Sequence, residues 1–104
     1  MIAAYEFSPK AEIDLEEIWE YIAPENVTAA ERLIANVEKA LENLSSFPHQ
    51  GHRRTDLTSR PLRFRPVGEY LIAYAPDEMP LWVVAVMHGR RSPHIMTAIL
   101  RGRE

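Results

Sequence analysis

The spacing of hydrophobic residues predicts a helix near the start of the chain. Between residues 11 and 22, apolar side chains recur every three or four positions, as on one face of a helix. Ser8 and Pro9 fit a helix start, because serine caps a free backbone N–H and proline has no N–H to leave unpaired. Pro24 ends the helix, since the residue before a proline avoids helical angles. Residues 2–7, ahead of this helix, predict a short strand.

A second amphipathic helix follows a short link, with an apolar stripe from residue 30 to residue 44. Thr28 and Glu31 match a capping box, in which each side chain bonds a free backbone N–H at the helix start. We therefore predict that Thr28 caps this helix and that it ends near Leu44. Because the link is short, the two helices should form an antiparallel hairpin.

The second half of the chain predicts strands. The three strand-like segments are residues 62–65, 69–75 and 81–88. The third is apolar at almost every position, which is typical of a central strand covered on both faces. Short turns between the segments favour an antiparallel meander, and Ser92 with Pro93 predicts a short final helix that ends near Leu100.

These elements predict a single α+β domain over residues 1–104. A helical hairpin would pack on a mainly antiparallel sheet of three or four strands. A length of 104 residues suits one domain, and 46% hydrophobic with 26% charged residues is typical of a folded core.

Cysteine is absent, which excludes disulfides, thiolate metal sites and a cysteine nucleophile. The longest clean apolar run, residues 81–87, is too short to cross a bilayer, and the N-terminus lacks the pattern of a secretion signal. We therefore expect a cytoplasmic protein with no membrane attachment.

Charge is distributed unevenly along the chain. Residues 1–47 contain three basic and ten acidic residues, a net charge of −7, whereas residues 48–104 contain nine arginines and five acidic residues, a net charge of +4. This asymmetry suggests two faces with different partners, unless the acidic half is only a solvated helical surface.

His88, Gly89, Arg90 and Arg91 end the predicted central strand, where side chains leave the sheet. Planar guanidinium groups bind phosphate or carboxylate through paired hydrogen bonds, and glycine allows a close backbone approach. His88 is a candidate acid or base because histidine titrates near neutral pH. The structural alternative is a histidine that satisfies the strand end and arginines that pair with helical carboxylates.

Arg63 and Arg65 share one face of the first meander strand and form a second candidate site. Other arginines nearby in sequence are Arg53, Arg54 and Arg60. Such a basic strip binds phosphates or an acidic peptide. Tyr70 and Tyr74, on one face of the next strand, offer stacking surfaces or else belong to the core.

His49 and His52 are three residues apart, near Asp56, and this spacing is compatible with zinc. They flank a glycine in a loop, and the sequence offers no clear third ligand. Phosphate-binding glycine loops and nucleophile elbows are also absent from the sequence. We therefore expect neither a metal nor a cofactor.

Five short motifs carry a family resemblance. They are SPKA at 8–11, DLEEIWEYI at 14–22, FPHQG at 47–51, PLRFRPVGEY at 61–70 and VMHGRR at 86–91. In this order and at this spacing, they make the chain similar to the ParE branch of the RelE/ParE toxin superfamily, also described as plasmid stabilisation proteins. The family's order of strand, two helices and three strands agrees with the predicted elements.

The resemblance implies a bacterial type II toxin–antitoxin module, in which a cognate antitoxin holds the toxin inactive. In ParE-like members the implied target is DNA gyrase, trapped in a poisoned complex with DNA, and the toxin itself breaks no bond. In RelE-like members the implied action is cleavage of messenger RNA in the ribosome, which needs a base, an acid and cations around the phosphate. A toxin that has decayed into an inactive antitoxin-binding module is the third alternative.

Charge and aromatic content favour gyrase over RNA. RelE-like nucleases tend to be strongly basic, with an aromatic acid or base near the C-terminus, whereas this chain has a pI of about 5.8 and no aromatic residue after Trp82. We therefore expect a toxin that is not an enzyme. The residues expected to contact the target or the antitoxin are Arg63, Arg65, His88, Arg90 and Arg91. Under the RNA-cleavage alternative, His88 transfers protons and these arginines bind the phosphate.

Overall fold

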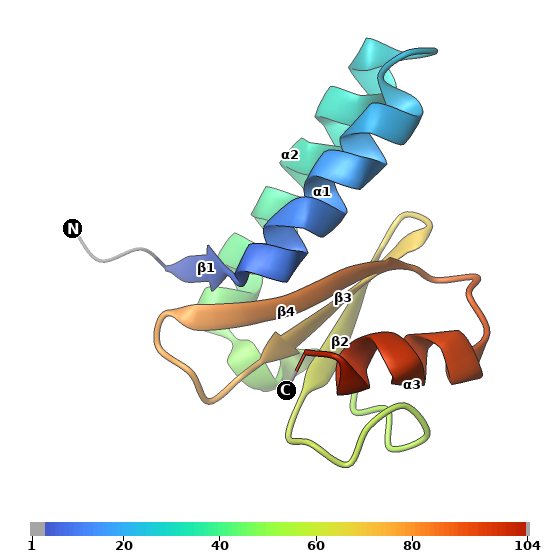
Figure 1. Ribbon diagram of the computed structural model, residues 1–104. Coiled ribbons are helices and arrows are strands. Elements are labelled where there is room, and N and C mark those ends of the chain that lie inside the picture. The colour runs from blue at the N-terminus through green and yellow to red at the C-terminus, as the bar shows by residue number, and fades with distance from the viewer. Residues whose placement is uncertain (1–3, 104) are drawn as a thin grey trace.

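A four-stranded sheet lies between a helical hairpin and a second covering layer (Figure 1). The computed structural model describes residues 4–103. In chain order the elements are β1 (Tyr5–Phe7), α1 (Pro9–Ile22), α2 (Val27–Ser46), the 3-10 turn η1 (Pro48–Gln50), β2 (Arg63–Val67), β3 (Tyr70–Ala75), β4 (Leu81–His88) and α3 (Pro93–Arg101). The predicted α+β fold is confirmed. Ile2 and Ala3 of the predicted first strand lie outside the described residues.

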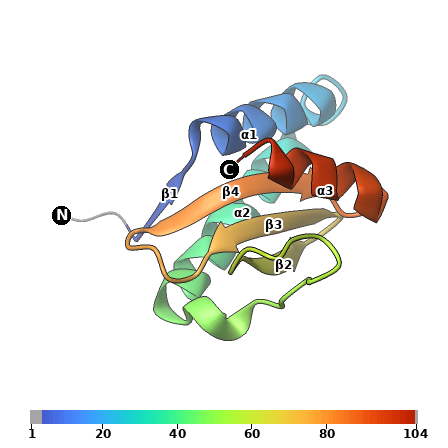
Figure 2. The same cartoon turned by 60° about the horizontal axis from the view of Figure 1, so that its bottom comes forward.

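The strand order is β1-β4-β3-β2, so β4 is an interior strand, as predicted. β1 pairs with β4 in parallel, whereas β2, β3 and β4 form the predicted antiparallel meander. The hairpin of α1 and α2 covers one sheet face, while α3 and the segment 51–62 cover the other (Figure 2). Within residues 4–103, no helix combines the length and the apolarity that a membrane crossing requires.

Two hydrophobic cores, one on each face of the sheet, explain why β4 is apolar almost throughout. The core under the hairpin includes Val37 and Leu41 of α2 packed against Ile72 and Val83 of the sheet. The opposite core is built around Phe64, Met87, Met96 and Leu100. A strand buried on both faces needs apolar side chains at successive positions rather than at alternate ones.

A β-bulge interrupts the pairing of β3 with β4. Tyr74 lies opposite Val83 while Ala73 lies opposite Ala85, so that Val84 is the extra residue. The insertion places Val84 and Ala85 in the same core, because it shifts the alternation of side chains by one position. The bulge also presents the Val84 carbonyl to side chains outside the ladder.

The start of α2 differs from the prediction. The N-cap is Asn26, whose side chain accepts a hydrogen bond from the backbone N–H of Ala29 at 3.0 Å, so the assignment of Thr28 was wrong. The backbone N–H of Asn26 bonds the Ile22 carbonyl, which closes the turn after α1 and leaves Asn26 extended at the helix entrance. Thr28 consequently lies inside the first helical turn. The C-terminal end at Ser46 is two residues beyond the predicted Leu44.

The two candidate caps make different predictions for stability. We expect Asn26→Ala to lower the free energy of unfolding by about 1 kcal/mol, the usual cost of losing an N-cap. Thr28→Ala should change it by less than about 0.5 kcal/mol, because Thr28 has no capping role and alanine favours the helix interior. Urea unfolding of both variants checks this, and a larger loss for Thr28→Ala would contradict the observed cap.

β2 runs over Arg63–Val67 instead of the predicted residues 62–65. Its outer edge is paired at Phe64, whose N–H and carbonyl both bond the backbone of His52. Pro66 lies two residues further along, and its backbone nitrogen faces the same outer edge, where no neighbouring strand needs an N–H donor. The strand therefore tolerates the proline, which cannot donate a hydrogen bond to another strand at this edge.

Candidate functional site

A cleft of about 770 Å³ lies between α1, the ends of β3 and β4, and the C-terminal segment. Ile18 and Ile22 of α1 form an apolar wall, and Tyr21 on the same helix is 81% exposed. Charged and polar side chains line the rest of the cleft. They include Asp14, Glu69, His88, Arg90, Arg91 and Arg103. The cleft therefore combines an apolar side with groups of both charges.

His88 ends β4 and packs edge-to-face against Tyr70, with ring centroids 5.2 Å apart. Its Nδ1 accepts the backbone N–H of Arg90 at 3.1 Å, and its Nε2 lies 3.9 Å from a carboxylate oxygen of Glu69. A neutral histidine with this bond carries its proton on Nε2. The lone pair that a general base requires is thus engaged with the backbone.

Gly89 lets this loop approach β3 closely. Its N–H donates to the Glu69 carbonyl at 2.7 Å, and a Cβ at position 89 would lie only 3.2 Å from the same oxygen. The Arg90 guanidinium is 3.3 Å from the Glu69 carboxylate, although its side chain remains 80% exposed. Arg91 is also exposed. Burial, followed by the charge of Glu69, raises the pKa of Tyr70.

The sequence interpretation missed an ion pair that lines the cleft. Arg103 donates two hydrogen bonds to Asp14, at 2.5 and 2.8 Å, and their side chains are only 15% and 13% exposed. Asp14 also accepts the N–H of Val86 at 2.9 Å, and Arg103 donates to the bulge carbonyl of Val84 at 3.0 Å. The hydrogen bonds that Arg103 donates to Asp14 raise the pKa of Arg103.

One signal for this pair was present in the sequence. Asp14 is three residues after Ala11 and four before Ile18, which places it on the buried stripe of α1. A carboxylate on a buried stripe needs a cation or several N–H donors. No local pattern indicates that the cation is Arg103, 89 residues away.

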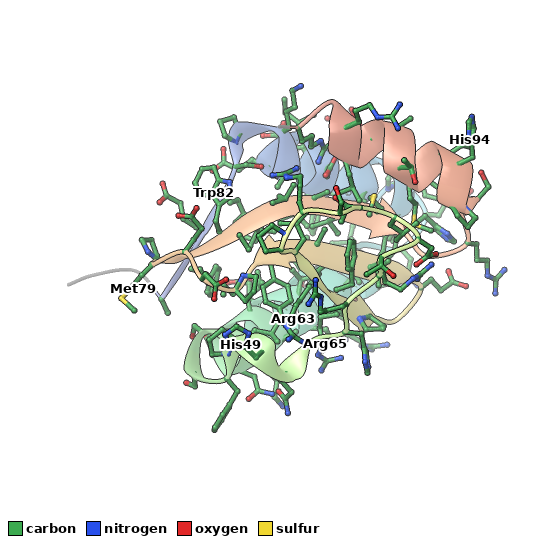
Figure 3. All side chains as sticks on the ribbon, turned by 90° about the horizontal axis from the view of Figure 1, so that it is seen from below. His49, Arg63, Arg65, Met79, Trp82 and His94 are labelled. Atoms are coloured by element: carbon green, nitrogen blue, oxygen red, sulfur yellow. The ribbon has the colours of Figure 1, made fainter. Side chains whose placement is uncertain are left out.

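Arg63 and Arg65 lie outside the cleft. They share the hairpin face of β2, as predicted, because Phe64 between them packs into the opposite core. Arg63 donates to the Gly51 carbonyl at 2.9 Å and faces a small hollow beside His49. Arg65 donates to the Pro66 carbonyl and faces a separate hollow beside α2. Figure 3 shows both arginines well away from His94 on α3.

Tyr74 belongs to the core, so the stacking alternative is wrong for this residue. Its hydroxyl donates to the Pro48 carbonyl at 2.7 Å and accepts the N–H of Gly51 at 3.0 Å. Burial raises its pKa above the ordinary value for tyrosine. The ring is fully buried and ties η1 to the sheet.

The residues considered for zinc have separate partners. His49 lies 3.4 Å from Asp77, Asp56 forms two hydrogen bonds with Arg54, and the backbone of His52 pairs with Phe64. In the part of the chain that the structure describes, no three histidine, aspartate or glutamate side chains are grouped as metal ligands. The zinc alternative therefore has no structural support.

The chain matches a known protein family. The model described as the ParE toxin of the type II toxin–antitoxin system, parDE, matches residues 5–93. The match extends from β1 to the first residue of α3. A search of curated proteins found no match.

Proposed function

Because the chain belongs to the ParE toxin family of type II toxin–antitoxin systems, we propose that it poisons DNA gyrase and is neutralised by a cognate antitoxin. The observation that most favours a binding role over catalysis is the geometry of His88. Its Nδ1 is bonded to the backbone, so it is poorly placed to remove a proton.

The position of the arginines supports the same proposal. Cleavage of RNA requires an acid, a base and cations that converge on one phosphate. Arg90 and Arg91 line the cleft with His88, whereas Arg63 and Arg65 face two other hollows. This division favours contacts spread over a protein interface.

The cleft has the chemistry expected of an antitoxin-binding site. Tyr21 and the two isoleucines of α1 offer apolar contacts, while Glu69 and Arg91 at the rim offer charges of both signs. An amphipathic segment that folds on binding can use both kinds of contact. We assign Arg63 and Arg65 to a second contact surface, at the other edge of the sheet.

Pulse labelling after induction in a bacterial host tests the target. We expect DNA synthesis to fall before protein synthesis, and purified gyrase to accumulate cleaved DNA when the toxin is added. Co-expression of the antitoxin should abolish both effects. An earlier fall in translation would favour RNA cleavage by His88, and no fall in either would favour an inactive antitoxin-binding module.

We expect the double variant Arg90→Ala/Arg91→Ala to weaken target or antitoxin binding by about 30- to 900-fold, since two interface arginines at about 1–2 kcal/mol each contribute about 2–4 kcal/mol together. His88→Ala should leave the accumulation of cleaved DNA within a fewfold of the parent protein. The control is Arg32→Ala, which removes an exposed cation of α2 that lies outside the cleft and outside the hollow beside Arg65. Titration calorimetry with the antitoxin and the gyrase cleavage assay measure these effects. Loss of DNA cleavage with His88→Ala alone would contradict the binding role.

A further inference from the structure

The layer that covers the second sheet face is strongly basic. We define this cover layer as residues 51–62 and 89–103, which include α3 and supply Leu57, Met96 and Leu100 to the core. It contains seven arginines and one carboxylate, that of Asp56. The hairpin on the opposite face has the reverse composition, with nine acidic residues and three basic ones over residues 9–46.

Several cations of the cover layer are available to a partner. Arg54, Arg90 and Arg103 pair with carboxylates. Within residues 4–103, the other four arginines of the layer have no carboxylate within 4.0 Å. They are Arg53, Arg60, Arg91 and Arg101. Arg60 donates to the carbonyl of Leu100, which holds its guanidinium beside the C-terminal end of α3.

The outward side of α3 adds to this surface. Met96 and Leu100 point into the core, whereas His94 and Arg101, two helical turns apart, are exposed. Figure 3 looks onto the cover layer and shows His94 projecting from the first turn of α3. Arg53 is exposed in the segment on the other side of the layer. The cations are therefore distributed over the layer and are not concentrated at one point.

The acidic hairpin does not cancel the charge of the cover layer. The two layers meet at the cleft, where Asp14 of α1 pairs with Arg103. Away from the cleft the sheet lies between them, and layers packed on opposite faces at the usual spacing of about 10 Å are about 20 Å apart. The screening length at physiological salt is about 8 Å, so the cover-layer arginines outside the cleft are largely screened from the hairpin carboxylates. The net charge of −3 consequently underestimates how strongly this face attracts an anion.

We infer that the cover layer binds the phosphate backbone of duplex DNA. Seven arginines against one carboxylate give this layer the charge that binding to a polyanion requires. The layer contains no phenylalanine, tyrosine or tryptophan. Proteins that bind single-stranded RNA usually stack bases on aromatic side chains, so the composition favours duplex phosphates.

This inference extends the proposed gyrase function, because gyrase acts on DNA. A toxin that contacts gyrase through the cleft would place the cover layer on the DNA held by the enzyme. DNA binding by the toxin alone is measured without gyrase, so that failure of one proposal is distinguishable from failure of the other.

Fluorescence anisotropy with a labelled 20-base-pair duplex and the full chain tests the inference. Four phosphate contacts predict that log K falls with log salt at a slope of about −3 to −4. The variant Arg53→Gln/Arg101→Gln removes two exposed cations that do not line the cleft. It should reduce the slope by about 2 and weaken binding at least tenfold near 0.1 M salt. The control Arg32→Gln/Lys39→Gln makes the same charge change on the hairpin and should alter binding less than twofold.

Three results would overturn the inference. They are no binding to the duplex at 50 mM salt with 100 μM protein, equal weakening by the control variant, and tighter binding to single-stranded RNA than to duplex DNA. Urea unfolding of both variants establishes that each remains folded. A steep salt slope that only the cover-layer variant reduces would support it, whether or not gyrase proves to be the target.

Discussion

Asp14→Ala is expected to lower the free energy of unfolding by about 3–5 kcal/mol, the usual cost of removing one partner of a buried ion pair. The substitution leaves the Arg103 guanidinium, only 15% exposed, without its carboxylate, and leaves the N–H of Val86 without an acceptor. A domain of this size is stable by about 5–15 kcal/mol in total. The variant should therefore be close to unfolding at 37 °C.

The effect is expected to be large because the ion pair satisfies backbone groups of β4 that lie beyond the end of β1. The short β1 pairs with β4 only as far as Val83, so the next backbone groups have no strand beside them. Asp14 and Arg103 bond the groups at Val86 and Val84 instead. The ion pair thereby replaces the missing strand and joins the C-terminal segment to α1.

Urea unfolding measures the effect, with Glu16→Ala as the control from an exposed position of α1. Glu16→Ala should change stability by less than about 0.5 kcal/mol, as is usual for surface positions. The double variant Asp14→Ala/Arg103→Ala should cost less than the sum of the single variants, because neither charge is then left unpaired. Equal costs for Asp14→Ala and Glu16→Ala would show that the pair is not stabilising.

Gly51→Ala should produce the second large loss, about 2–5 kcal/mol, from overpacking and from lost buried hydrogen bonds. A Cβ at position 51 would lie 2.3 Å from the Tyr74 hydroxyl and 3.0 Å from the Phe64 carbonyl. The fully buried tyrosine would have to move, which breaks its bonds to Gly51 and Pro48. The backbone angles of Gly51 do not require glycine, since its φ is −68°, so the expected effect is one of space.

A double-mutant cycle with Tyr74→Phe separates space from hydrogen bonding. Tyr74→Phe alone should cost about 1–3 kcal/mol, because the buried N–H of Gly51 and the partly buried carbonyl of Pro48 lose their partner. In the double variant the clashing hydroxyl is absent, so the combined cost should be less than the sum. Gly102→Ala is the matched control, since a Cβ there meets no atom closer than 3.5 Å. A loss for Gly102→Ala as large as that for Gly51→Ala would contradict the close-contact explanation.

The cleft and the cover layer differ in chemistry. The cleft beside α1 is lined by apolar residues and by charges of both signs, whereas four arginines of the cover layer have no carboxylate within 4.0 Å among the described residues 4–103. The family match ends at residue 93, so most of α3 lies beyond the matched segment. Arg103 lies in this final segment and bonds Asp14, which lies within the matched residues.

Local patterns in the sequence were sufficient for most of the secondary structure. Both serine caps preceding proline, at Ser8 and Ser92, were predicted correctly, and so were the bounds of β4. These features depend on neighbouring residues, because capping and side-chain periodicity act within one or two turns. The charge difference between residues 1–47 and 48–104 could also be predicted from the sequence. It becomes a difference between layers because the first half supplies the hairpin and the second half supplies the cover layer.

The tertiary structure alone decided how the candidate sites are assembled. The bulge at Val84, the bonding of Tyr74 to Pro48 and Gly51, and the pairing of Asp14 with Arg103 all join segments far apart in the chain. The separation of Arg63 and Arg65 from the cleft likewise depends on strand order and on where the hairpin packs. Such contacts follow from register and packing over the whole domain, so no local pattern of residues could predict them.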